Sequence, residues 1–217
     1  MPINTTFLGH SGFHFASDRH ALVVDPFLSG NPLAVHQPAD IRCQYLALTH
    51  GHADHFGDTL NIAKANHATL IATFEICEYC TQQGVEKTEP ANHGGKVVTD
   101  FGFVAFTAAF HSSSYQGRYM GMPAGLIIRI GGVTIYHCGD TALFSDMRLI
   151  GEIYQPDIAC IPVGDRFTMD PRDGARAAEL IQPKIAIPIH YKTFPLLTAD
   201  ISAFKPKGIE VKIMQPG

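Results

Sequence analysis

Apolar and polar positions in the first hundred residues predict short strands around one clear helix. Residues 13–26 are typical of a hairpin, since a turn at residues 17–19 separates two apolar runs. Residues 45–50 form an apolar strand, residues 58–68 carry apolar side chains at helical spacing, and residues 69–74 form the next strand. A strand, a helix and a strand in this order predict a parallel pair joined by a right-handed crossover.

The second half of the chain shows a similar arrangement of strands and helices. The predicted strands are residues 103–110, 125–130, 133–140, 158–163 and 185–190, and the predicted helices are residues 145–154 and 173–182. The tail, residues 205–217, favours a surface turn and one last strand. Because each half has a β-rich stretch followed by strand–helix units, the pattern predicts an α/β fold with two packed sheets and helices outside, a four-layer α/β/β/α sandwich.

Composition and charge narrow the class of protein. Of the 217 residues, 46% are hydrophobic and 17% are charged, so a substantial core can form, and we expect one domain over residues 1–217. The net charge of −4 disfavours nucleic acid as a partner. No apolar run has the length of a membrane span, and residues 1–13 lack the features of a secretion signal. We therefore expect a cytoplasmic protein with a small-molecule substrate and no membrane partner. The sequence leaves open whether the protein forms a homo-oligomer.

Cysteine usage favours reduced thiols. The five cysteines are an odd number in a chain without an export signal, which argues against a disulfide framework. Cys77 and Cys80 lie in residues 74–84, which are typical of a helix ended by glycine, and no second Cys-x-x-Cys pair completes a zinc ribbon. The pattern favours two small apolar residues one helical turn apart.

Metal-capable side chains follow several of the apolar strands. His50, His111, Asp140 and His190 each stand at the carboxyl end of a strand. Sheets of α/β proteins commonly place ligand-binding groups at this edge. We therefore expect these side chains to lie close together.

The sequence "THGHADHF" around His50 adds further donors. His50 and His52 are separated by one residue, so an extended backbone directs both imidazoles to the same side. Asp54 and His55 follow at the expected start of a helix over residues 55–66 and face the same cavity. With the strand-end residues they make five imidazoles and two carboxylates, enough for two divalent cations with an open position for water. We expect zinc or manganese, with iron and nickel as further candidates.

Several other histidines and Cys138 are not predicted to be metal ligands. Four histidines in polar or turn contexts are expected to be ordinary surface residues, namely His20, His36, His67 and His93. His137 has the opposite strand parity to Asp140, so we expect it to face away from the metals. Cys138 shares the parity of Asp140 and either lines the cavity or is a small buried residue.

These motifs make the chain resemble the metallo-β-lactamase superfamily, whose His-x-His-x-Asp-His signature stands here as His50-Gly-His52-Ala-Asp54-His55. More narrowly, it is similar to small metal-dependent hydrolases related to the L-ascorbate-6-phosphate lactonases. The matching segments span nearly the whole chain and are "GHSGF", "DPFLSGNP", "LTHGHADHFGD", "FHSSS", "GMPAGLII", "YHCGDTALFSDM", "PVGDRFTMDP" and "IPIHYKTFP". The resemblance implies the four-layer fold and a hydrolase.

The resemblance also implies how the ligands are shared between two metals. It implies His50, His52 and His111 on one metal, Asp54, His55 and His190 on the other, and Asp140 bridging. The sequence "AFHSSSYQG" departs from the "GHTPG" of glyoxalase II-like and lactamase-like members, which argues against thiolester and lactam substrates. Flavodiiron relatives carry Glu at the position of His52, so a di-iron oxygen-reducing centre is not expected.

Chemistry at such a metal pair predicts catalytic roles for two residues. Two divalent cations about 3.5 to 4 Å apart lower the pKa of a shared water toward about 7 and polarise a substrate oxygen. We expect Asp54 to orient the resulting hydroxide and shuttle its proton. His10 is either an oxyanion donor or substrate contact, which the resemblance favours, or an ordinary polar residue in a Gly-flanked turn. Asp25 either accepts the free N–H of a ligating imidazole or forms only an Asp-Pro turn.

Loops around these motifs supply substrate-binding candidates, Asn31, Arg118 and Arg166. Guanidinium groups suit a carboxylate or phosphate on the substrate, although an arginine in such a loop is more often a solvated surface residue. We therefore predict a metal-dependent hydrolase that uses a metal-bound hydroxide on a small anionic ester, lactone or phosphoester. The alternatives are a nuclease or phosphodiesterase on the same site and a non-catalytic metal-binding module, and the lack of a Lys/Arg-rich segment counts against the nuclease.

Overall fold

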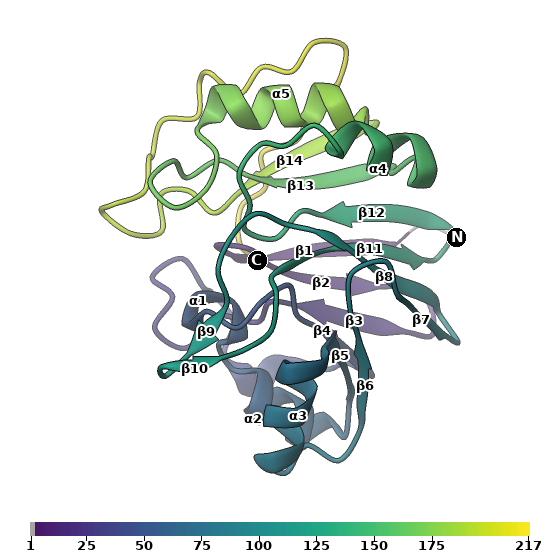
Figure 1. Cartoon of the computed structure of the whole chain (residues 1–217). Coiled ribbons are helices and arrows are strands. Elements are labelled where there is room, and N and C mark those ends of the chain that lie inside the picture. The colour runs from purple at the N-terminus through teal and green to yellow at the C-terminus, as the bar shows by residue number, and fades with distance from the viewer. Residues whose placement is uncertain (1–2) are drawn as a thin grey trace.

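The computed structural model describes residues 3–217, with two β-sheets face to face at its centre (Figure 1). The helices are α1 (Ala53–Phe56), α2 (Thr59–Asn66), α3 (Phe74–Gln82), α4 (Met147–Tyr154) and α5 (Pro171–Ile181), with a 3₁₀ turn η1 (Pro38–Asp40). In Figure 1, α2 and α3 cover the outer face of the first sheet, and α4 and α5 cover that of the second. The predicted α/β/β/α sandwich is therefore confirmed.

The first sheet comes from the first half of the chain, in the order β1-β2-β3-β4-β5-β6. Its strands are β1 (Asn4–Gly9), β2 (Gly12–Ala16), β3 (Ala21–Val24), β4 (Tyr45–Ala47), β5 (Thr69–Thr73) and β6 (Thr88–Ala91). β2 and β3 form the predicted antiparallel hairpin, and β4 and β5 form the predicted parallel pair. The edge strands β1 and β6 were not predicted, and β6 carries Glu89 and Pro90, which suit only a sheet edge.

The second sheet comes from the second half, in the order β15-β14-β13-β12-β11-β8-β7. Its strands are β7 (Lys96–Thr99), β8 (Gly102–Ala108), β11 (Ala124–Ile130), β12 (Val133–His137), β13 (Ile158–Pro162), β14 (Ile185–Ile189) and β15 (Glu210–Val211). Strands β12 to β15 are mutually parallel, so β12, β13 and β14 end at the same edge. A separate ribbon pairs β9 (Ser114–Tyr115) with β10 (Arg118–Tyr119). The last strand predicted in the tail is β15.

Apolar side chains fill three layers, one between the sheets and one under each helical layer. β11 shows how one strand serves two of them. Leu126 and Ile128 pack between the sheets, whereas Ile127 packs beneath α4 and α5. Because strands of this kind are buried on both faces, their sequences are nearly continuous apolar runs.

The helix expected over residues 55–66 is divided in two at Gly57, so that expectation was wrong. Gly57 has a φ of 39°, and a Cβ at this position would collide with the carbonyl oxygen of Pro26. Only glycine fits such a close approach. As a result α1 is a single turn, and it directs Asp54 and His55 independently of α2.

The structure also bears on the state of the cysteines and on membrane-spanning helices. Every cysteine is a buried free thiol, and Cys77 and Cys80 pack on the inner side of α3 in the core beneath the first helical layer. Within residues 3–217, no helix combines the length and the apolar character that a bilayer crossing requires.

Candidate metal centre

Loops that follow the strands bring the metal-capable residues together at one edge of the sandwich. They follow β4, β8, β12 and β14, and α1 adds two more donors. Their ligand atoms form overlapping groups, and within each group all atoms lie within 4.8 Å of one another. The structure thus brings together every residue predicted as a metal ligand, namely His50, His52, Asp54, His55, His111, Asp140 and His190.

His50, His52 and His111 form what we call the first donor group. Nε2 of His50 lies 3.0 Å from Nδ1 of His52, and the ring centroid of His111 is 5.2 Å from that of His50 and 5.0 Å from that of His52. His50 is buried, whereas His52 and His111 are half-buried. Three imidazoles with a partly exposed face are typical of a metal site that keeps a position open for water or substrate.

Asp54, His55 and His190 form the second donor group, which is more deeply buried. Nε2 of His190 lies 3.7 Å from Oδ2 of Asp54, and both histidines are fully buried. His10 joins this group, since its Nε2 lies 3.1 Å from the same carboxylate oxygen. Sequence reasoning expected His10 to face the substrate, but the structure gives it Asp54 as a partner.

Asp140 lies between the two donor groups. Its Oδ1 is 3.2 Å from Nε2 of His55, and its Oδ2 is 3.0 Å from Nε2 of His190. The same Oδ2 is 3.5 Å from Nε2 of His111 in the first donor group. This placement matches the bridging position that the family resemblance implies for Asp140.

Buried donor atoms in the cluster test whether metal ions fit. Nε2 of His55 and Oδ1 of Asp140 are fully buried and face each other at 3.2 Å, but they do not form a hydrogen bond of regular geometry, and neither has another hydrogen-bond partner within the described chain. A buried polar atom without a partner costs about 1–3 kcal/mol, so such atoms are rare. A divalent cation would satisfy both, because zinc, manganese and iron all accept imidazole and carboxylate ligands. The residues therefore fit metal ions.

The two donor groups hold protons differently. Burial lowers the pKa of His55, but the carboxylates of Asp140 and Asp25 outweigh burial, and the net pKa lies well above its usual value. In the same way, Asp140 and Asp54 overcome burial and raise the pKa of His190 to about 9. In the first donor group no carboxylate compensates fully, so burial lowers the pKa of each imidazole.

Asp25 lies behind the cluster and contacts ligands of both groups. Its Oδ2 accepts the Nδ1–H of His55 at 2.7 Å and the hydroxyl of Thr49 at 2.6 Å. The Thr49 hydroxyl oxygen lies 3.0 Å from Nδ1 of His50. Because a carboxylate only accepts, Thr49 gives its proton to Asp25, and its oxygen accepts the Nδ1–H of His50. Asp25 thus fixes the tautomer of both histidines, which leaves each Nε2 to the cluster.

Thr49 was missed in the sequence because threonine is ordinary in a strand. The available signal was its position directly before the His-x-His motif. Asp25 has a φ of 44°, and a non-glycine residue in this strained region is often held there for function.

The loop around β9 and β10 supports the His50–His52 segment. The Ser113 hydroxyl accepts the N–H of Gly51 at 3.1 Å and donates to the Met120 carbonyl at 3.2 Å. A Cβ on Gly51 would collide with the Met120 side chain, so only glycine allows this close contact. Ser113 and Met120 therefore hold the ligand loop in place.

The predicted substrate-binding residues differ in how far the structure explains them. The Asn31 amide is buried and bonded to the backbone of Phe27 and Leu33, both at 2.9 Å, so it organises its own loop. Arg118 donates to a glutamine of α3 and lies over the Tyr79 ring, which favours a structural role. Arg166 is exposed. Substrate contact stays a prediction for all three.

His137 faces away from the metal cluster, as strand parity predicted, and Cys138 is the small buried residue, one of the two alternatives given for it. Both ring nitrogens of His137 bond to backbone, at 2.8 Å to the Ser11 carbonyl and at 3.2 Å to the Gly139 N–H, so neither faces the metal cluster. Cys138 packs in the core beneath α4 and α5, not in the cavity. Gly139 has a φ of 63°, so the alternation of faces ends before Asp140.

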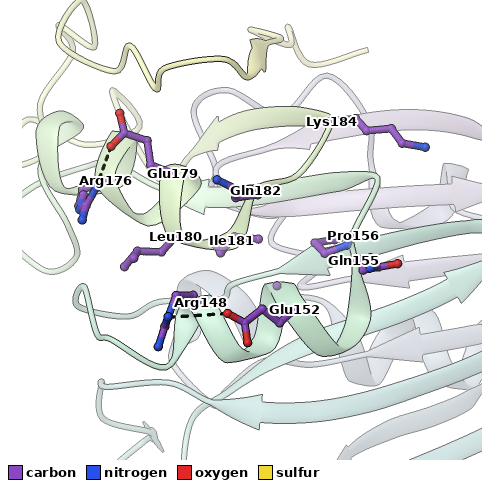
Figure 2. A pocket seen from close by; sticks show the side chains of 11 residues that line it. Arg148, Glu152, Gln155, Pro156, Arg176, Glu179, Leu180, Ile181, Gln182 and Lys184 are labelled. Carbon is purple, nitrogen blue, oxygen red and sulfur yellow. Dashed lines mark hydrogen bonds and ion pairs between the residues drawn. The ribbon is translucent and has the colours of Figure 1, made fainter.

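A separate cavity of about 610 Å³ lies between α4 and α5, on the outer face of the second sheet (Figure 2). Its charged side chains are already paired, Arg148 with Glu152 and Arg176 with Glu179. None of the residues that line it belongs to the donor groups. The cavity therefore offers no group for the chemistry of the metal centre.

The fold and the donor cluster together define a protein of the metallo-β-lactamase class. A family model described as the β-lactamase superfamily domain matches residues 20–191. Among curated relatives, a UPF0173 metal-dependent hydrolase of Staphylococcus carnosus is 47% identical, with 98% of this chain and 96% of the relative covered. One of Carboxydothermus hydrogenoformans is 43% identical with the same coverage. The chain belongs to the β-lactamase superfamily and, within it, to the UPF0173 metal-dependent hydrolases.

Solved structures agree with this assignment. Igni18, a metallo hydrolase from the archaeon Ignicoccus hospitalis, is 36% identical and superposes with a TM-score of 0.90, over 99% of this chain and 96% of that one. YhfI from Bacillus subtilis is 16% identical with a TM-score of 0.78, which shows a shared fold alone. The predicted superfamily and enzyme class are thus confirmed, and the lactonase-related branch stays a prediction.

Proposed function

We propose that this metal-dependent hydrolase holds two divalent metal ions and cleaves a small anionic ester, lactone or phosphoester. The observation that carries the proposal is the position of Asp140, whose Oδ2 lies 3.0 Å from His190 and 3.5 Å from His111. The first donor group would hold one ion, the second donor group would hold the other, and Asp140 would reach both. Zinc or manganese suits these donors best, and iron and nickel are further candidates.

Asp54 is the proposed acid/base residue. When bound, the ions supply an activated water and a Lewis-acid contact for a substrate oxygen. Burial raises the pKa of Asp54, but the neighbouring imidazoles of His10, His190 and His55 outweigh burial, so the net pKa lies below its usual value. The half-buried carboxylate is therefore ionised at neutral pH and can orient the water by accepting a hydrogen bond from it. His10 belongs to the same machinery because it contacts Asp54.

Arg166 supports an anionic substrate. Its loop packs against the metal edge, since Gly164 lies so close to the backbone of His190 that a Cβ would collide with it. The exposed guanidinium of Arg166 suits a carboxylate or phosphate. We also propose a cytoplasmic location and no nucleic-acid or membrane partner, in keeping with the net charge of −4.

The test combines metal analysis with turnover. Purified protein is analysed for bound metal and then assayed on p-nitrophenyl esters, lactones, phosphomonoesters, cyclic nucleotides and single-stranded RNA. We expect about two ions per chain and turnover of a small anionic substrate that a chelator abolishes and added metal restores. Trace metal and chelator-resistant activity would refute the proposal. Efficient turnover of RNA or cyclic nucleotides would favour a nuclease or phosphodiesterase, and bound metal without any turnover would favour a binding module.

A further inference from the structure

His10 occupies an unusual position at the tip of the β1–β2 hairpin. It is fully buried, and its φ of 58° lies in the left-handed region, which is strained for a residue other than glycine. Its carbonyl accepts the N–H of His190 at 2.8 Å, so the hairpin tip is fastened to the end of β14. Strain of this kind persists where the surrounding structure needs the residue in place.

Thr193 determines which nitrogen of His10 carries the proton. The Thr193 hydroxyl donates to the Tyr191 carbonyl at 3.3 Å, and its oxygen lies 2.9 Å from Nδ1 of His10. A hydroxyl has one proton, and this one is used on Tyr191, so the oxygen accepts the Nδ1–H of His10. A neutral imidazole has only one N–H, and Nε2 then presents a lone pair.

The lone pair on Nε2 faces the second donor group. Nε2 lies 3.1 Å from Oδ2 of Asp54, and both atoms lie within 4.8 Å of the donor nitrogens of His55 and His190. The edges of two aromatic rings, Phe27 and Phe194, pack on His10 with centroids 5.9 and 5.5 Å away. A lone pair and a carboxylate repel each other at this distance unless a cation lies between them. Two ligand atoms that each lie about 2.0–2.2 Å from the same ion are separated from each other by roughly the distance found here between Nε2 of His10 and Oδ2 of Asp54.

We propose that Nε2 of His10 is a further protein ligand of the ion held by Asp54, His55 and His190, with Thr193 as the residue that positions it. This inference rests on the proposed function, since it assumes the second ion. His10 adds a fourth donor of its own to this group, beside the shared Asp140, whereas the first donor group has three imidazoles and the shared Asp140. The first donor group therefore has fewer protein donors, and we expect water and substrate to bind there.

The test measures zinc binding, not turnover. Stepwise zinc affinities are measured by competition with a chromophoric chelator for the wild type, His10→Asn, Thr193→Val and Thr193→Ser. Asparagine tolerates the left-handed backbone of residue 10 but has no Nε2. His67→Asn is the matched control, because His67 is an exposed histidine that is also left-handed, with a φ of 48°.

We expect His10→Asn to weaken one zinc site at least about 100-fold and to leave the other unchanged. Thr193→Val should weaken the same site about tenfold, as loss of an outer partner does, while Thr193→Ser and His67→Asn behave as wild type. If His10→Asn binds both zinc ions as tightly as the wild type does, the proposal is overturned, and His10 is only a hydrogen-bond partner of Asp54. If circular dichroism shows that His10→Asn does not fold, equal affinities in Thr193→Val and Thr193→Ser would overturn it instead. A wild type that binds two zinc ions without hydrolysing any substrate would refute the proposed function alone.

Discussion

The two donor groups lie side by side, yet they differ in burial, charge and number of donors. The first donor group has three imidazoles, two of them half-buried, whose pKa values burial lowers. The second donor group has a carboxylate of its own, and its histidines are fully buried with raised pKa values. The difference suggests a division of labour, in which the buried group anchors an ion and the more exposed group presents an ion to substrate.

Asp140→Asn should remove the link between the two groups and have the largest effect. Asparagine keeps the size of the side chain but loses the negative charge that His55, His111 and His190 share. We expect the loss of zinc from both sites and no measurable turnover, an effect well beyond the about 100-fold typical of an outer partner. Zinc analysis and steady-state kinetics check this, and full zinc content with near-normal turnover would show that Asp140 is not shared.

His52→Ala should affect only the first donor group. Because His52 is half-buried on a loop that the core does not depend on, the fold should stay intact. Turnover should be abolished and zinc content should fall toward one ion per chain, while His67→Asn, which replaces an exposed histidine, changes neither. Loss of both ions in His52→Ala would contradict the independence of the two groups.

The two groups should also respond differently to pH. Without metal, the raised pKa of His190, about 9, keeps its imidazole protonated at pH 7, and a metal ion must displace that proton. Since His55 also has a raised pKa, up to two protons must leave, and zinc affinity of the second group should rise by at least about tenfold per pH unit from pH 7 to about pH 9. The first group is already neutral at pH 7, so its affinity should be flat over this range. Zinc titrations at several pH values check this. If the affinities of both donor groups depend on pH in the same way, the predicted difference between the groups is wrong.

Thr49→Val should have the smallest effect. It tests whether Asp25 and Thr49 connect His55 of the second donor group with His50 of the first. Valine keeps the shape of threonine but removes the hydroxyl between Asp25 and His50, so the tautomer of His50 is no longer fixed. We expect about tenfold weaker zinc binding at the first group alone. Thr49→Ser should bind like the wild type. If both variants bind equally well, the Thr49 hydroxyl does not orient the ligand.

Sequence reasoning could find the metal ligands because strands and their ends leave a readable pattern. Apolar runs that stop at a histidine or an aspartate placed the donors at one edge, and the His-x-His spacing placed two imidazoles on one side. The layers followed from the alternation of strands and helices in each half. These signals are local in the chain, which is why they survive without any knowledge of tertiary contacts.

The supporting residues could not be found in this way because their roles depend on distant contacts. Thr193 meets His10 across 183 positions of the chain, and no local pattern marks either as a partner of the other. Backbone geometry caused the error in the helix expected over residues 55–66. Gly57 breaks this helix because the chain touches Pro26 there.

Anomalous scattering from a zinc-loaded crystal tests the central claim most directly. The account predicts two anomalous peaks at the zinc edge, one among His50, His52 and His111 and one among Asp54, His55 and His190, with Asp140 beside both. A single peak, or peaks away from these seven residues, would contradict it.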